Sequence, residues 1–258
     1  MKVALVFKSD KVNQDYISQI RERIISRGHI LTDSKPEVVI FIGGDGTFLK
    51  AAHQYIDDVE NIKFVGLCTG HLGFFFDYGQ NDIDLLLDDL ENNNLKIVKH
   101  RFLKAKVEEQ VFYAVNEIRI ESPFHSLISE VYIDNNYLET FRGNGLIVCS
   151  SIGSTAYNKS LSGAVVTPEL DTLQLSEIAP INNVIYSSLH SPLVLSDKSK
   201  IVLKTKTDNI LVGYDQFVSD SHSACSVEFS LSDKTISLLY KSDYSYIKLL
   251  NSKFIGKK

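Results

Sequence analysis

The stretch Val38-Val39-Ile40-Phe41-Ile42-Gly43-Gly44-Asp45-Gly46-Thr47 joins five consecutive apolar residues to a glycine-rich turn. An apolar run without alternation is typical of a strand buried on both faces, as in a parallel sheet covered by helices. The glycines let the backbone turn sharply and approach a phosphate, and a helix that begins here adds partial positive charge. The stretch therefore predicts a phosphate-binding turn at the carboxyl end of a buried strand.

The first hundred residues alternate between strand and helix patterns, which is typical of an α/β domain with a parallel sheet. The predicted elements are strand Val3–Phe7, a helix that ends at Gly28, strand Val38–Ile42, a helix over 47–55, strand Ile62–Leu67, and a helix over 82–90 with Asn81 as its N-cap.

After His100 the patterns are mostly those of short strands, with one weakly helical stretch from Leu170 to Ala179. The predicted strands are Val111–Val115, Ile118–Ile120, Val131–Ile133, Leu146–Cys149, Ile201–Leu203, Val227–Leu231 and Ile236–Tyr240, with a hairpin turn at Asp134-Asn135-Asn136. We therefore predict an α/β N-terminal domain followed by a β-sandwich-like C-terminal domain, with the boundary near residue 100 and a ligand cleft between the two.

The composition narrows the class of protein. The 258 residues carry 27 basic and 32 acidic side chains, a net charge of −5, which argues against a general nucleic-acid binder and a polybasic membrane anchor. No apolar run approaches the roughly 18 residues of a membrane span, and the start of the chain lacks a signal-peptide core. The three scattered cysteines exclude a disulfide framework. We expect a cytoplasmic globular enzyme or ligand-binding module.

Asp45 is the unusual member of the glycine-rich turn, because a carboxylate repels phosphate. It is expected either to accept a proton from an attacking hydroxyl or to hold a metal ion; the alternative is a helix N-cap in an ordinary strand-to-helix turn. The chain has no Walker, dinucleotide G-x-G-x-x-G or G-x-S-x-G motif. Its histidines form no metal-binding pair at helical spacing, and Cys68 and His71 lack a matching second pair.

Two further segments carry polar groups suited to a nucleotide. Asn116-Glu117 interrupts a strand pattern, and its oxygens can accept hydrogen bonds from sugar hydroxyls, although a solvent-facing bulge would have the same pattern. The segment 153–160 combines small residues, which admit a flat ring, with the hydroxyls of Thr155, Tyr157 and Ser160, although a surface loop could share this composition.

Together and in this order, these motifs resemble the NAD kinase family, in particular its short bacterial members. The resemblance covers essentially the whole chain. The residues that carry it are Gly43–Thr47, Thr69-Gly70-His71-Leu72-Gly73-Phe74, Asn116-Glu117, Arg142-Gly143-Asn144-Gly145 and Thr155-Ala156-Tyr157-Asn158-Lys159-Ser160. The glycine-rich turn alone is shared with lipid kinases and phosphofructokinases, whereas the whole set is specific.

The resemblance implies phosphoryl transfer from ATP, or in some members polyphosphate, to the 2′-hydroxyl of the adenosine ribose of NAD, which gives NADP. Mg²⁺ would enter with ATP, and the protein would hold no metal tightly. Asp45 would accept the hydroxyl proton, with Gly46 against the same ribose. The other implied contacts are Asn116 and Glu117 with the adenosine, Thr155, Ala156, Tyr157 and Ser160 along the adenine and diphosphate, Phe74 beside the base, and Arg142, Asn144, Ala179 and Gln216 with the rest of the dinucleotide or a neighbouring subunit's site.

The resemblance also implies a homo-oligomer, often a tetramer, and a tail of about residues 241–258 that returns to the α/β domain of residues 1–100. Residues 101–240 would then form the dinucleotide-binding domain. The chain departs from the family pattern at Asn144, where an aspartate is usual. It also has Cys149-Ser150-Ser151-Ile152 in place of Ser-Thr-Pro-[ST]. Ile152 is therefore assigned no polar contact.

Two rival functions remain open from the residues. One is a lipid or sugar kinase that shares the glycine-rich turn, although no basic or amphipathic membrane-facing segment is evident. The other is a non-catalytic sensor of NAD or NADP, against which the intact Asp45 counts, because a pure binder gains nothing from a carboxylate beside phosphate.

Overall fold

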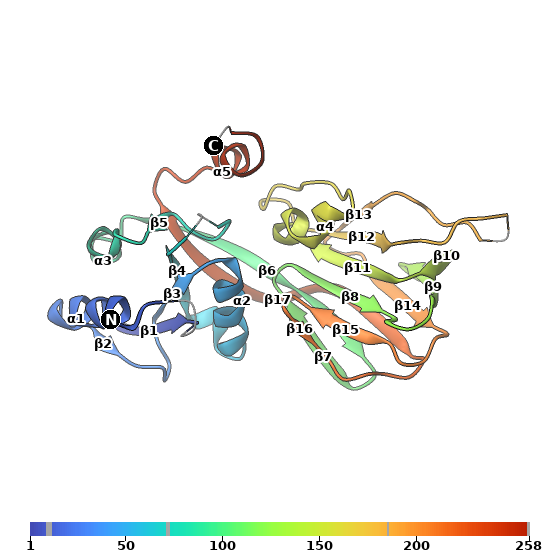
Figure 1. Ribbon diagram of the computed structural model, residues 1–258, viewed down its shortest axis with the longest axis horizontal. Helices are drawn as coiled ribbons and strands as arrows, with labels where there is room; N and C mark the ends of the chain where they lie inside the picture. Colours follow the sequence, from blue (N-terminus) through green and yellow to red (C-terminus); the bar gives the residue numbers. More distant parts are fainter. Residues whose placement is uncertain (9–11, 71–72, 185, 257–258) are drawn as a thin grey trace. The chain divides into compact units, whose positions relative to one another are not determined.

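The computed structural model describes residues 1–8, 12–70, 73–184 and 186–256, and the chain divides into two compact units (Figure 1). Unit 1 comprises Met1–His100 and Lys234–Lys258, and unit 2 comprises Arg101–Asp233. The C-terminal part of the chain therefore belongs to unit 1, which confirms that the tail returns to the first domain.

Unit 1 is built on a parallel sheet. Its strands are β1 (Lys2–Phe7), β2 (Ile30–Leu31), β3 (Val38–Gly43), β4 (Lys63–Cys68) and β5 (Tyr78–Gly79), joined by the end of β17 (Ser226–Lys241). Their order is β2-β1-β3-β4, and on the far side of β4 its beginning pairs with β17 and its end with β5, all in parallel. The predicted parallel sheet is confirmed.

Helices cover both faces of this sheet, because successive side chains of the apolar strands point to opposite faces. On one face, α1 (Gln14–Ser26) and α3 (Ile83–Glu91) pack in one core cluster with Val38, Ile40 and Ile42 of β3. Phe41 points to the other face, where its ring lies 5.1 Å from that of Phe48 on α2 (Asp45–Gln54). The remaining helical segments of unit 1 are η1 (Val59–Asn61), α5 (Tyr246–Leu250) and η3 (Asn251–Ile255).

Unit 2 consists of antiparallel strands in two groups. One sheet has the order β13-β12-β11-β8-β15-β16, and the strands β10-β9-β14-β17 form the other group, with β6 pairing β17 and β7. The bounds are β6 (Leu95–Val107), β7 (Gln110–Ala114), β8 (Glu117–Glu121), β9 (Leu127–Ile133), β10 (Asn136–Gly143), β11 (Gly145–Ser150), η2 (Ile152–Thr155), α4 (Tyr157–Ser160), β12 (Thr172–Ile178), β13 (Leu193–Ser196), β14 (Ile201–Thr205), β15 (Leu211–Tyr214) and β16 (Phe217–Val218).

Side chains from both groups of strands meet in one apolar core, which includes Ile118, Val148, Leu203 and Phe229, all fully buried. The predicted hairpin between β9 and β10 turns at Asp134 and Asn135, which have φ of 50° and 67°. Two successive positive φ values match the twist of antiparallel strands. The predicted β-sandwich-like character of the second domain is confirmed.

Several boundaries differ from the prediction. Leu170 to Ala179 is not helical: Thr172–Ile178 is strand β12, whose Leu173 side chain enters the core while Gln174 on the other face is also buried. The two strands predicted over 227–231 and 236–240 are one strand, β17. Helix α3 has Asp82 rather than Asn81 at its N-cap position, and α2 begins at Asp45 rather than at residue 47.

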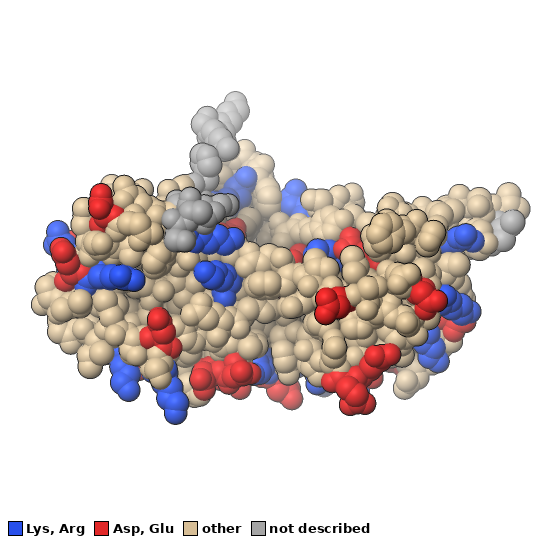
Figure 2. Space-filling model, turned by 60° about the horizontal axis from the view of Figure 1, so that its bottom comes forward, with Lys and Arg blue, Asp and Glu red and all other residues tan. Residues whose placement is uncertain are grey.

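No helix among the described residues is long and apolar enough to cross a membrane. On the face drawn in Figure 2, acidic and basic side chains are interspersed over the surface, and the basic ones do not gather into a single patch.

Candidate active site

The glycine-rich turn leads from β3 directly into α2. Gly43 has a φ of 147°, which favours glycine, and a Cβ at this position would stand 2.5 Å from Thr47 Oγ1. The turn is held by backbone hydrogen bonds: the Thr47 N–H donates to the Gly44 carbonyl at 2.7 Å, and the Thr69 N–H donates to the Gly43 carbonyl at 3.3 Å. Residue 43 therefore has space only for a glycine.

A pocket of about 170 Å³ lies beside this turn. Its lining comes from the carboxyl ends of β1, β3 and β4 and the residues that follow them: Lys8, Val12, Gly43, Gly44, Thr47, Thr69 and Gly70. A glycine backbone, a helix start and a lysine are the groups with which proteins commonly bind phosphate. Residues 9–11 and 71–72 lie outside the described residues, and His71 of the Cys68–His71 pair is among them.

Asp45 is the first residue of α2, and its carboxylate turns toward the segment that follows β4. The Phe75 N–H donates to Asp45 Oδ1 at 3.3 Å, and the Phe74 N–H also bonds this carboxylate. The N-cap position of α2 belongs to Gly44, and no side chain caps it. The N-cap interpretation of Asp45 is therefore wrong: the carboxylate is held by another segment and does not serve its own helix.

Burial raises the pKa of Asp45 above the ordinary aspartate value, while the amides of Phe74 and Phe75 and the positive charge of Lys253 act in the opposite direction. Lys253 lies in η3, so the returning tail contributes a charge to this site. The tail also contributes an aromatic ring, because Phe254 lies 5.5 Å, centroid to centroid, from half-buried Phe74. A half-buried carboxylate with a raised pKa is suited to accept a proton.

Asn116 and Glu117 lie in unit 2, where Asn116 stands between β7 and β8 and Glu117 is the first residue of β8. Both side chains are buried, with exposed fractions of 8% and 6%. The solvent-facing bulge considered for this pair is therefore wrong. The Ser150 N–H donates to the Asn116 carbonyl at 2.9 Å, and a Cβ at Gly153 would overlap that same carbonyl. The pair is thus clamped between β11 and the segment that follows it.

The Glu117 carboxyl has an unusual electrostatic environment. Burial, together with the charge of Asp215, raises its pKa to about 8, while Arg119 and the Tyr157 N–H act in the opposite direction. Its Oε2 is buried without a hydrogen-bond partner among the described residues. Such an atom is costly unless a bound molecule supplies the missing partner.

The segment after β11 is organised by buried polar groups. Asn158 is fully buried; its Oδ1 accepts a hydrogen bond from Ser176 Oγ at 2.9 Å, and its backbone carbonyl accepts one from the Gly163 N–H. Ser154 is also fully buried; its hydroxyl donates to the Val166 carbonyl and accepts a hydrogen bond from the Val166 N–H. The residues of this segment that the resemblance assigns to the ligand are less buried: Thr155, Ala156 and Tyr157 are half-buried, and Ser160 is exposed.

The other four implied residues lie in two places in unit 2. Arg142, Asn144 and Ala179 gather where β10, β11 and β12 meet: the Asn144 N–H donates to the Ile178 carbonyl, and a Cβ at Gly143 would stand 2.7 Å from the Ala179 carbonyl. Arg142 lies over the Tyr186 ring and donates to its hydroxyl at 2.6 Å.

Gln216, by contrast, is exposed in the turn between β15 and β16, directly after Asp215. The structure therefore brings together Asp45, Gly46 and Phe74 in unit 1. In unit 2 it places Asn116 and Glu117 close to Tyr157 and to the turn that contains Gln216. This group lies near the carboxyl end of β11, and the group around Asn144 lies at its amino end.

Sequence reasoning missed Asp215, Lys253, and the buried polar residues Asn158 and Gln174 as contributors to these sites. Asp215 lies in a two-residue turn between short apolar strands, a pattern that indicates a hairpin but not which way the carboxylate points. Lys253 carries no local signal, because its place near Asp45 depends on the fold of the whole tail.

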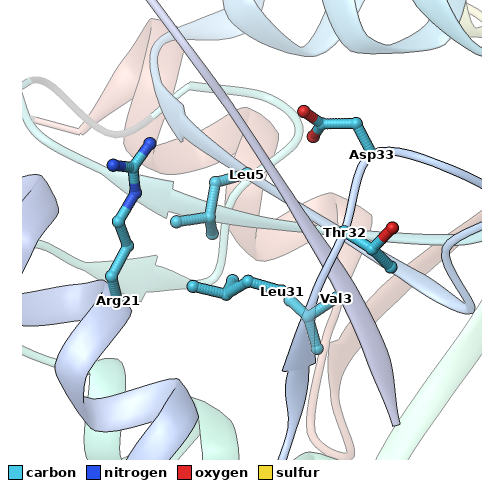
Figure 3. A pocket seen from close by; sticks show the side chains of 6 residues that line it. All are labelled: Val3, Leu5, Arg21, Leu31, Thr32 and Asp33. Atoms are coloured by element: carbon cyan, nitrogen blue, oxygen red, sulfur yellow. The ribbon is translucent and has the colours of Figure 1, made fainter.

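A separate pocket of about 330 Å³ lies at the edge of the unit 1 sheet, near β2 (Figure 3). Val3, Leu5 and Leu31 form its apolar part, and the charged ends of Arg21 and Asp33 lie on opposite sides of it. None of the candidate site residues named from the sequence lines it.

Comparison with known proteins defines the class first. The model of the ATP-NAD kinase N-terminal domain matches residues 3–95, and that of the ATP-NAD kinase C-terminal domain matches residues 115–239. The chain thus contains both domains of a nucleotide-dependent kinase.

Curated relatives agree. An NAD kinase of Latilactobacillus sakei is 34% identical over 265 residues, covering 100% of this chain and 99% of its own. An NAD kinase of Leuconostoc mesenteroides is 37% identical over 231 residues, covering 88% of each chain. The chain belongs to the NAD kinase family.

Solved structures show the same fold. The crystal structure of a yeast NADH kinase complexed with NADH superposes with a TM-score of 0.87 at 15% identity, covering 100% of this chain and 89% of that one. An NAD kinase from Archaeoglobus fulgidus in complex with ATP has a TM-score of 0.77 at 22% identity, covering 98% of both chains.

Proposed function

We propose that this protein transfers the γ-phosphoryl group of ATP to the 2′-hydroxyl of the adenosine ribose of NAD, with Asp45 as the general base. The observation that carries the proposal is the half-buried Asp45 carboxylate, whose pKa is raised, at the edge of a glycine-rich turn beside a pocket. Membership of the NAD kinase family supports the choice of substrates.

The reaction asks for few groups from the protein. Ionised Asp45 takes the proton of the 2′-hydroxyl as its oxygen forms a bond to the γ-phosphorus, and the bond from that phosphorus to ADP breaks. Phosphoryl transfer depends mainly on alignment and on neutralisation of charge. Amides of the glycine-rich turn and the start of α2 supply oriented donors for phosphate oxygens. Mg²⁺, which enters as part of the ATP complex, neutralises charge on the triphosphate.

The residues of unit 2 are assigned to recognition of NAD. Asn116 and Glu117 bind the adenosine, for which the partnerless Oε2 of Glu117 offers a hydrogen-bonding atom. Around them, Thr155, Ala156, Tyr157 and Ser160 line the adenine and diphosphate. Phe74 of unit 1 is assigned to the base and Gly46 to the ribose. The rest of the dinucleotide is assigned to Arg142, Asn144, Ala179 and Gln216. Asn144 and Ala179 are exposed, so the Asn144 amide side chain can reach a ligand or a second subunit.

Product identification tests this function. The purified protein is incubated with NAD and either ATP-Mg²⁺ or polyphosphate, and the product is identified by mass spectrometry and by a dehydrogenase that uses only NADP. We expect NADP with ATP, and the polyphosphate arm measures donor range. Calorimetric binding of NAD without NADP from either donor would support the sensor instead, and phosphorylation of a lipid or sugar but not of NAD would support the other rival.

The expected homotetramer and cytoplasmic location belong to the same proposal. The homotetramer rests on the resemblance, and the location rests on the composition of the sequence. Light scattering of the purified protein, with and without NAD, tests the subunit number. A mass that corresponds to one chain under both conditions would contradict the tetramer.

A further inference from the structure

Asp215 occupies the first position of the two-residue turn between β15 and β16, with a φ of 49° and an exposed fraction of only 6%. Its side chain points back into unit 2 and not outward as turn aspartates commonly do. Asp215 Oδ2 accepts a hydrogen bond from the Val115 N–H at 2.8 Å, and Oδ1 accepts one from the Asn116 N–H at 2.8 Å.

These two amides stand at a break between strands. β7 ends at Ala114 and β8 begins at Glu117, so Val115 and Asn116 have no place in either strand. Buried amides without partners are costly, and one carboxylate satisfies two successive amides with two charge-assisted bonds. The carbonyl side of the break is satisfied separately, because Ser150 Oγ donates to the Val115 carbonyl at 2.6 Å.

The backbone of Asp215 is tied to the same strand. Its N–H donates to the Glu117 carbonyl at 3.0 Å, and its carbonyl accepts a hydrogen bond from the Arg119 guanidinium at 3.3 Å. Asp215 is therefore hydrogen-bonded to the backbone of Val115, Asn116 and Glu117. It is the shared anchor of that short segment.

We propose that Asp215 is a positioning residue that sets the orientation of Asn116 and Glu117 for binding of the nucleoside part of the substrate. Asp215 acts through the backbone of these two residues. The inference rests on the proposed function, since it assigns the adenosine of NAD to the Asn116-Glu117 pair.

The charge of Asp215 has a second consequence for Glu117. The charged and titratable groups that face the Glu117 carboxyl are Asp215 from the β15–β16 turn, Arg119 from β8 and Cys149 from β11, and the Tyr157 N–H of α4 also bonds it. Burial and Asp215 outweigh Arg119 and that amide, so the pKa of Glu117 reaches about 8. At neutral pH the carboxyl is therefore mostly protonated, and it can donate as well as accept a hydrogen bond.

Protonated Glu117 suits an anionic dinucleotide better than ionised Glu117 does. When the pH rises through about 8, the site loses a donor and gains a second buried negative charge near Asp215. Affinity for NAD is therefore expected to fall on the alkaline side, and removal of the Asp215 charge is expected to move this loss to lower pH, because the pKa of Glu117 then falls.

The test compares Asp215→Asn with a matched control, Asp208→Asn. Asp208 is an exposed loop aspartate of unit 2 that likewise accepts a backbone hydrogen bond, from the Ala224 N–H at 2.9 Å. Asparagine at 215 can accept from only one of the two amides and carries no charge. We expect its KM and calorimetric Kd for NAD to rise about tenfold at pH 7, the size of one lost charge-assisted bond, with kcat and the KM for ATP nearly unchanged.

The pH dependence supplies a readout that a merely structural role would not move. Log KM for NAD is expected to turn upward near pH 8 in the wild type and at lower pH in Asp215→Asn. In Glu117→Gln, which mimics the neutral carboxyl, the upward turn is expected to vanish, and this variant keeps the test decisive even where Asp215→Asn does not fold.

Two results would overturn the inference: an Asp215→Asn variant with wild-type Kd and pH profile, or a Glu117→Gln variant that retains the upward turn. Failure of the proposed function has a different outcome. In that case the wild type forms no NADP at all, while calorimetry of NAD binding to the same variants still reports on Asp215.

Discussion

Gly73 packs directly against the catalytic candidate Asp45. A Cβ at Gly73 would overlap Asp45 Oδ1 and would also come within 2.9 Å of the Phe76 ring. The main chain of the segment after β4 thus forms the wall against which the Asp45 carboxylate rests, and the amides of Phe74 and Phe75 hold it there. The Asp45 carboxylate can therefore lie in this position only because residue 73 has no side chain.

Substitution of Gly73 by alanine is therefore expected to lower turnover by about 10²-fold, because displacement of a catalytic group by about 1 Å has effects of this size. Binding of NAD should change little. Steady-state kinetics with calorimetry measure both. The matched control is Gly79→Ala, where a Cβ meets its nearest neighbour, Asp82, at an ordinary 3.5 Å. Equal loss of activity in the two variants would contradict the account.

The acid side of the pH–rate profile should report Asp45. A general base must be ionised, so kcat is expected to fall as the pH falls through the raised pKa of this aspartate. Lys253 lowers that pKa through its positive charge, and Lys253→Gln should therefore move the acid limb to higher pH. Lys248→Gln, an exposed change in the same tail, should leave the limb in place. A profile that is identical in wild type and Lys253→Gln would exclude this electrostatic link.

Ionised Asp45 should also lower the stability of the folded protein. Because its pKa is higher in the folded protein than in an unfolded chain, folding favours the protonated form, and the folded state loses stability as the pH rises through the raised pKa. Asp45→Asn removes this loss, so its thermal midpoint at pH 8 should exceed that of the wild type, with a smaller difference near pH 4. Asp57→Asn, an exposed change in the same unit, should show neither effect. A lower midpoint for Asp45→Asn at pH 8 would contradict the prediction.

The buried frame behind the adenine-binding candidates should be sensitive to Asn158. Replacement by alanine leaves the Ser176 hydroxyl without its acceptor and opens space beside Gly163, whose position packs directly on the Asn158 amide. We expect a loss of about 1–3 kcal/mol in the free energy of unfolding, measured in urea. Exposed Asn182→Ala should stay within about 0.5 kcal/mol of the wild type. A urea unfolding midpoint for Asn158→Ala equal to that of the wild type would show that these buried hydrogen bonds do not stabilise the fold.

The parts of the fold that were predictable depend on local sequence. Val38–Ile42 is apolar on both faces, so it had to be a strand covered on both sides, and the glycines after it could only be a turn. Asp134-Asn135 likewise tolerates the positive φ values that a tight hairpin needs. In each case neighbouring residues contain the whole physical reason.

The parts that were missed depend on residues far apart in the chain. The strand β12 carries little local signal, because its polar residues Gln174 and Ser176 are buried and hydrogen-bonded on the second face of the strand. Asp215 binds the Asn116 amide 99 residues away, and Lys253 reaches Asp45 only through the fold of the tail. Motifs could name Asp45, Asn116 and Glu117, but not the groups that hold them and set their pKa values.

The measurement that tests the central claim most directly is the rate of NADP formation by Asp45→Asn at saturating NAD and ATP-Mg²⁺, taken beside its calorimetric affinity for NAD. The account predicts an unchanged Kd and a rate about 10²–10⁴-fold below that of the wild type, the usual contribution of a positioned general base. An Asp45→Asn enzyme that binds NAD normally and forms NADP at the wild-type rate would contradict it.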